Sequence, residues 1–198
     1  MSKISLSKLN GFLKIQCDDL RAAGLDASEY KDYIIAMLFL KRVNDLFEVA
    51  QTIREKNLKK EHPNITQAKL DRELEIENAT EYEFFVPTDA RWKDIQMVTE
   101  NIGDALTVAL NSIENSRKEI LEGVLSGTKF NALKSNGDKL LTDEVLKELI
   151  DNFRFCRINY FALAKVRELE RWSQYLNPII AIMPSRIFVE FMIRHQGH

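Results

Sequence analysis

Arg91 and Trp92 are adjacent in the sequence, and their chemistry suits contact with a charged or aromatic partner. An arginine guanidinium forms paired hydrogen bonds with phosphate or carboxylate groups, and an indole ring offers a large apolar face. The pair could therefore contact a DNA backbone or a protein partner. In the alternative interpretation, which we favour, Trp92 anchors the hydrophobic core and Arg91 pairs with a nearby carboxylate.

No other cluster of polar residues has the spacing of a catalytic or metal site. His62 precedes a proline in a charged loop, and His195 and His198 lie at the end of the chain, so no His-x-x-x-His or Glu-x-x-His pattern occurs. Acidic pairs such as Asp18-Asp19 suit a solvated helix surface, and no nucleophile stands beside a base. The sequence therefore predicts no catalytic residue and no metal ligand.

Periodic apolar residues predict a chain made of helices. Helices are expected over residues 5–23, 28–56 and 66–79, after Asn101 as N-cap, over residues 120–125, and after Thr142. His62-Pro63 is expected to stop the second helix, and residues 135–138 have the composition of a turn. Alternation typical of strands is missing, so the predicted class is an all-α bundle of about five to seven helices.

The second expected helix is apolar around most of its circumference in its middle. The apolar positions are Tyr33, Ile34, Met37, Leu38, Leu40, Val43, Leu46 and Phe47. Such a helix has to be covered by others. Just before it, Gly24 suits the left-handed residue that ends the first helix, and Asp26 with Glu29 forms a capping-box pattern. An apolar, aromatic connection without periodicity follows at residues 82–92, and we expect Trp92 to be buried between helices.

At 198 residues, the chain has room for one large domain or for a domain with an appendage. Cys17 and Cys156 are far apart, which predicts two reduced core residues and a cytoplasmic protein. The first residues lack a signal-peptide pattern, and the longest apolar run, residues 33–40, is too short for a membrane span. Residues 1–151 carry 21 Lys and Arg against 27 Asp and Glu, which argues against autonomous DNA binding.

Two blocks of sequence resemble the start of the modification (M) subunit of type I restriction-modification systems, which are multi-subunit adenine-specific DNA methyltransferases. The first block begins at Leu20 with Leu-Arg-x-x-Gly-Leu-x-x-x-Glu-Tyr-x-x-Tyr and continues with Leu-Phe-Leu-Lys-Arg and Asp-Leu-Phe. The second block, residues 85–92, is similar to the aromatic-x-Pro-x-x-Ala-Arg-Trp segment of the family. Similar helices follow, so the resemblance spans roughly residues 5–153.

For the family, this resemblance implies transfer of a methyl group from S-adenosylmethionine to the N6 of adenine. The implied partners are a specificity subunit, a second M subunit, a restriction subunit and DNA. The N-terminal helical domain is implied to pack on the catalytic domain, to help enclose DNA and to assemble the complex. No membrane partner is expected.

The catalytic and cofactor motifs of the family do not occur in this sequence. The seven glycines include no Gly-x-Gly pair, and Asn177-Pro178 is followed by two isoleucines instead of a proline and an aromatic ring that would stack on the target base. We therefore expect residues 1–153 to form the non-catalytic helical domain, to be inactive alone and to bind no cofactor.

Residues 154–198 depart from the family pattern. The charge balance also reverses there, because residues 152–198 carry 7 basic residues against 3 acidic ones. We expect them to be an atypical, irregular tail before a missing methyltransferase domain, left by truncation or a disrupted reading frame. We also expect residues 1–153 to fold without this tail. The alternative for the whole chain is a helical protein–protein interaction or dimerisation module with no methyltransferase context.

Overall fold

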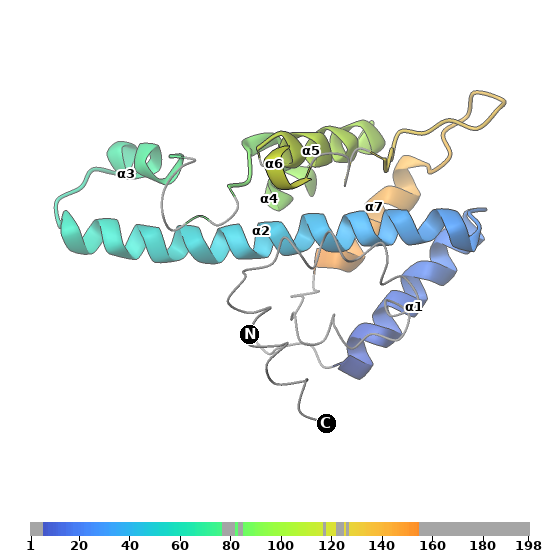
Figure 1. The fold of residues 1–198 in the computed structure, drawn as a ribbon, viewed down its shortest axis with the longest axis horizontal. Helices are drawn as coiled ribbons and strands as arrows, with labels where there is room; N and C mark the ends of the chain where they lie inside the picture. Colours follow the sequence, from blue (N-terminus) through green and yellow to red (C-terminus); the bar gives the residue numbers. More distant parts are fainter. Residues whose placement is uncertain are drawn as a thin grey trace.

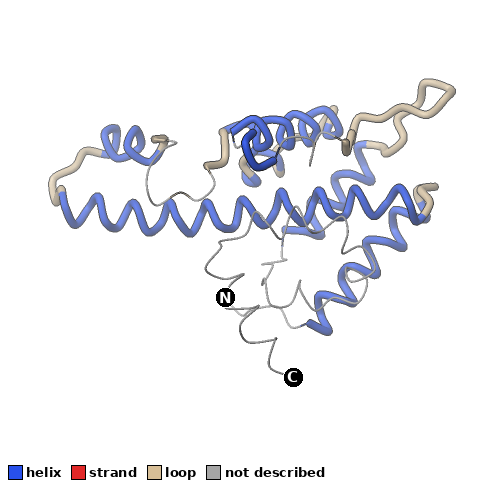
Figure 2. Tube along the Cα trace, viewed as in Figure 1, coloured by secondary structure: helices blue, strands red, loops and turns tan. Residues whose placement is uncertain are grey.

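The computed structural model describes residues 6–76, 82, 85–116, 118–121, 125 and 127–154. Its elements are α1 (Leu6–Ala22), α2 (Ala27–Glu61), α3 (Gln67–Leu74), the 3₁₀ turn η1 (Thr88–Ala90), α4 (Trp92–Ile95), α5 (Ile102–Ser116), α6 (Lys118–Leu121) and α7 (Asp143–Arg154). The described residues form no strand beyond an isolated bridge between Leu133 and Lys139 (Figure 2). The predicted all-α class is confirmed.

The 35-residue helix α2 is the axis of the fold and is about 50 Å long at the usual helical rise. Figure 1 shows α3, α4, α5 and α6 along one side of α2, while α1 and α7 meet it toward its N-terminal end. Helices α1, α3, α4 and α7 all contact α2 directly. The predicted boundary between residues 153 and 154 remains a prediction, because the tail from residue 155 lies outside the described residues.

Local sequence rules account for the start of α2. Gly24 adopts the left-handed conformation, with φ of +100°. The Asp26 N–H donates to the Glu29 carboxylate at 3.0 Å, and the Glu29 N–H donates to the Asp26 carboxylate at 3.1 Å. This reciprocal pair is the predicted capping box.

The C-terminal end of α2 differs from the expectation. The helix continues past Lys56 to Glu61, directly before His62-Pro63. The added turn is supported by α3, because Leu58 is buried and Arg54 donates from Nε to the Glu73 carbonyl at 2.9 Å. Helix α3 itself ends at Leu74, five residues earlier than expected.

The core surrounds the middle of α2, as the apolar pattern predicted. Every residue from 33 to 40 is buried. The other helices contribute Leu13 and Leu20, Leu70, Trp92 and Ile95, Leu106, Leu110 and Ile113, and Leu146, Leu149, Ile150 and Phe153.

Cys17 is buried and forms no disulfide, whereas Cys156 lies outside the described residues. Among the described helices, none combines the length and apolar character that a membrane span requires.

Candidate functional site

Asn44 joins the middle of α2 to the segment that carries Arg91 and Trp92. Its Nδ2 donates to the carbonyl oxygens of Leu40 at 2.9 Å and Ala90 at 3.0 Å. Its Oδ1 accepts from the backbone N–H of Trp92 at 2.7 Å. That N–H is one of the groups a helix start leaves without an internal partner, so the buried Asn44 amide caps α4 from a different helix.

Trp92 is a core residue, with 4% of its surface exposed. The ammonium of Lys41 lies 5.5 Å from the centre of the indole ring, within the range of a cation–π contact. Lys41 in turn pairs with Asp45, one helical turn along α2, and both side chains are buried. Within the described structure, the indole Nε1 and the second Asp45 carboxylate oxygen are buried without a hydrogen-bond partner.

Arg91 is held by the same region of the chain. Its guanidinium forms a two-pronged bond with the Glu75 carboxylate, at 2.9 and 2.5 Å, and its Nε donates to the Val86 carbonyl at 3.3 Å. The guanidinium carbon also lies 5.3 Å from the centre of the Phe47 ring. The cation therefore ties the segment after α3 to the segment before α4.

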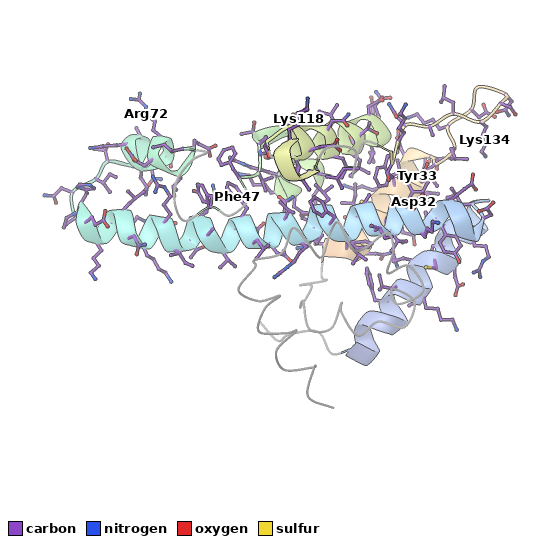
Figure 3. All side chains as sticks on the ribbon, in the orientation of Figure 1. Asp32, Tyr33, Phe47, Arg72, Lys118 and Lys134 are labelled. Atoms are coloured by element: carbon purple, nitrogen blue, oxygen red, sulfur yellow. The ribbon has the colours of Figure 1, made fainter. Side chains whose placement is uncertain are left out.

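Three aromatic rings complete this region. Phe47 on α2 (Figure 3) lies 5.0 Å from the ring of Tyr82 and 5.4 Å from the ring of Phe85, and the latter two lie 5.9 Å apart. The Tyr82 hydroxyl donates to the Leu74 carbonyl at 2.7 Å. The aromatic connection between α3 and α4 thus packs on α2, which explains why it is apolar without being periodic.

The structure places Arg91 and Trp92 in the arrangement of the favoured alternative, with a core indole and a paired guanidinium. Contact of either residue with DNA or a partner stays a prediction. The sequence interpretation missed Asn44, Lys41 and Asp45. Their signal was the presence of polar residues inside an otherwise apolar helix, but nothing in the sequence pairs Asn44 with residues 46 and 48 positions away.

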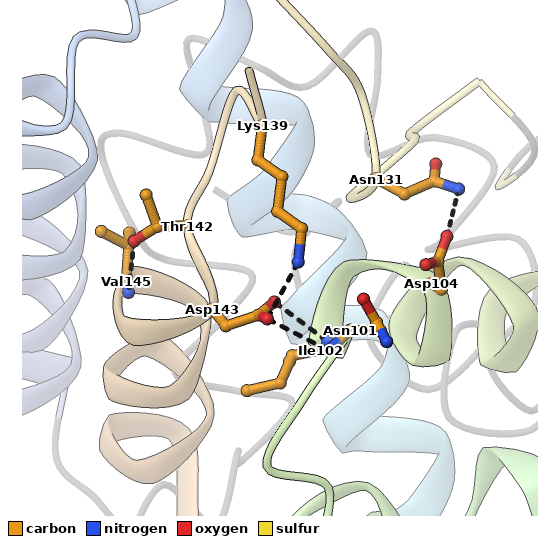
Figure 4. Close-up of polar contacts among 8 residues, drawn as sticks. All are labelled: Asn101, Ile102, Asp104, Asn131, Lys139, Thr142, Asp143 and Val145. Atoms are coloured by element: carbon orange, nitrogen blue, oxygen red, sulfur yellow. Dashed lines mark hydrogen bonds and ion pairs between the residues drawn. The ribbon is translucent and has the colours of Figure 1, made fainter. Parts of the chain in front are cut away.

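Asp143 forms a second polar junction, between α5 and α7 (Figure 4). Its carboxylate accepts from the backbone N–H groups of Asn101 at 3.0 Å and Ile102 at 3.1 Å, and from the Lys139 ammonium at 2.9 Å. Asn101 was expected to cap α5 with its own side chain; instead it has a φ of +52°, and Asp143 from the start of α7 supplies the acceptor. The bond from Lys139 is the largest cause, and the N–H groups a further one, of a lowered pKa of the Asp143 carboxyl.

The turn at Phe130 and Asn131 packs closely on α5. A Cβ on Gly103 would lie 2.5 Å from the Phe130 carbonyl oxygen, so this glycine permits the backbones to approach. Asn131 donates to Asp104 at 2.7 Å, and the Tyr33 hydroxyl donates to the Lys129 carbonyl at 3.3 Å. Gly103 therefore serves the close packing of the two backbone segments.

We expect Asp143→Asn to lower the free energy of unfolding by about 0.5–2 kcal/mol at neutral pH, the usual range for a lost capping group. The carboxylate is 24% exposed, so screening keeps its ion pair with Lys139 weak. Since folding lowers the pKa of Asp143, its contribution is present above the ordinary aspartate pKa and is lost as the pH falls below it. Urea unfolding at neutral pH and near pH 3 measures this.

Asp151→Asn is the matched control, because Asp151 is exposed on the same helix. It should change stability by less than about 0.5 kcal/mol. A difference between wild type and Asp143→Asn that stays constant down to acid pH would contradict the capping role.

These contacts define the chain as a helical domain built on one long helix, in which buried polar side chains fix how the segments pack. No group of three or more His, Cys, Asp or Glu side chains in the described residues is arranged to hold a metal ion. The chain belongs to the family of the HsdM N-terminal domain, whose model matches residues 9–153. This is the N-terminal domain of the M subunits of type I restriction-modification systems, so the resemblance is confirmed. Comparison with curated proteins finds no match.

Proposed function

We propose that the chain serves as the non-catalytic helical domain of a type I adenine-specific M subunit. In this role it packs on the catalytic domain, helps to enclose DNA and helps to assemble the complex. One observation carries the proposal: the two blocks that resemble the family bind each other, through Asn44 with Ala90 and Trp92 and through Phe47 with Arg91. The residues that mark the family therefore build a scaffold, which supports a structural role.

The proposed partners are the specificity subunit, the second M subunit, the restriction subunit and DNA. Co-expression of the chain with a methyltransferase domain and a specificity subunit of the same system tests the proposal. Co-elution of all three, with adenine-N6 methylation that depends on the chain, is the expected result. A catalytic pair that is fully active and never retains the chain would contradict the proposal and favour an interaction module outside this context.

S-adenosylmethionine belongs, in this proposal, to the catalytic domain. The sequence contains no Gly-x-Gly pair of the kind that a glycine-rich cofactor turn would carry, and the Phe130 backbone lies against Gly103. We expect calorimetric titration of the chain with S-adenosylmethionine to show no saturable heat. The complex with a methyltransferase domain is the positive control, and a micromolar dissociation constant for the chain alone would refute this expectation.

A further inference from the structure

The side of α2 turned away from α3 carries a row of residues that we call the α2 row: Leu46, Val49, Ile53, Lys56 and Lys60. They recur at alternating intervals of three and four, so they share one face of the helix. Val49 and Ile53 are 49% and 50% exposed, and Leu46 is half-buried. In Figure 1 the labelled helices α3 to α6 all lie along one side of α2. An apolar row of this kind is the seam along which a second helix packs.

The α2 row continues a row that is already part of the core. The same three-and-four spacing leads back through Arg42 to Phe39 and Ile35, which are both buried. The apolar face therefore emerges from the domain and runs on along the distal half of the helix. Apart from Arg42, this face is apolar from Ile35 to Ile53. Single exposed apolar residues need no explanation, but neighbouring ones on one face are better suited to a partner than to water.

The charges at the end of the α2 row indicate what the partner carries. Lys56 and Lys60 are exposed and form no ion pair within the described structure. On the other faces of the same segment, Arg54 pairs with Glu73 and Lys59 pairs with Glu55. The two unpaired ammonium groups beside an apolar row match a helix with carboxylates flanking its own apolar face.

A second copy of the chain fits this face poorly. Antiparallel pairing centred between Val49 and Ile53 would set the Lys56 ammonium against the apolar Leu46, and parallel pairing would set each Lys56 against its own counterpart. Like charges at facing positions are unfavourable. DNA fits poorly as well, because three of the five residues in the α2 row are apolar and only two are cations that could contact phosphates.

We propose that the α2 row is a docking face for an acidic amphipathic helix of another polypeptide. This inference is independent of the methyltransferase context, so its failure would leave the proposed function standing.

The test uses the full chain and two labelled peptides with leucine and isoleucine heptads, one with glutamate and the other with lysine at the flanking positions. In fluorescence anisotropy, the glutamate peptide should bind at least about tenfold more tightly than the lysine peptide. Ile53→Asp should weaken binding of the glutamate peptide by about tenfold or more. The double change Lys56→Glu and Lys60→Glu should reverse the preference between the peptides.

Ile15→Asp is the matched control, because Ile15 is an isoleucine of similar exposure on α1. It should leave peptide binding unchanged, and circular dichroism should show that every variant keeps its helices. Absence of saturable binding, equal affinity for both peptides, or an equal loss with Ile15→Asp would overturn the proposal. Self-association in sedimentation equilibrium that is abolished by Ile53→Asp would assign the face to a second copy. Binding of duplex DNA that is lost only in the double variant would assign the face to DNA. Either result would overturn the proposal.

Discussion

Trp92→Ala should lower the free energy of unfolding by about 3–5 kcal/mol, the range found when a large buried ring is truncated. The indole is 4% exposed and lies among α2 and α4, so its removal leaves a cavity that the surrounding helices can fill only in part. The change also removes the ring that faces the Lys41 ammonium, while Lys41 and Asp45 stay buried. Urea unfolding followed by circular dichroism measures the loss.

Two further variants separate the ring from other effects. Trp92→Phe keeps an aromatic ring and removes the buried Nε1, which has no hydrogen-bond partner in the described structure, so it should cost less than half as much as alanine. Met97→Ala, at a side chain that is 78% exposed, should cost less than about 0.5 kcal/mol. If Trp92→Ala lowered the free energy of unfolding by less than about 1 kcal/mol, the result would contradict a core role for Trp92 and favour a binding role.

Asn44→Ala should lower the free energy of unfolding by about 2–4 kcal/mol, because each buried polar group left without a partner costs about 1–3 kcal/mol. The change removes three hydrogen bonds at once and leaves the Trp92 N–H and the Ala90 carbonyl without their partner. Asn44→Asp should also destabilise the chain, since a carboxylate still accepts from Trp92 but cannot donate to the Leu40 and Ala90 carbonyls.

Asn57→Ala is the matched control for Asn44, because Asn57 is exposed on the same helix. Alanine is the better helix former, so this change should be neutral or slightly stabilising. Hydrogen exchange supplies an independent measurement: in Asn44→Ala the Trp92 amide should exchange faster, while amides at the start of α2 stay protected. An Asn44→Ala protein as stable as wild type would show that the α4 junction does not depend on this amide.

Short-range rules explain what could be predicted about the fold. The start of α2 follows from Gly24 and the Asp26–Glu29 pair, whose bonds join residues three positions apart. The turn at residues 135–138 likewise follows from neighbours, since Asn136 bonds to the Asp138 side chain and backbone. The helical class and the buried middle of α2 follow from apolar periodicity, which extends over only a few turns.

The end of α2 illustrates where such rules stop. The sequence predicts an end near Lys56, yet α2 runs to Glu61 because α3 returns and packs on its last turns. Tertiary packing, rather than helix propensity, decides the stability of such a segment. The sequence predicts that the aromatic connection packs in the core, but the rings that it meets depend on the return of α3 as well.

The sequence by itself determined the helical class, the start of α2, the family and the adjacency of Arg91 and Trp92. Only the tertiary structure decided that Asn44 caps α4 across 48 positions and that Asp143 caps α5 across more than 40. The physical reason is that a capping bond within one turn depends on neighbouring residues alone. A bond between distant segments depends on how the helices cross, which is set by the packing of the whole core.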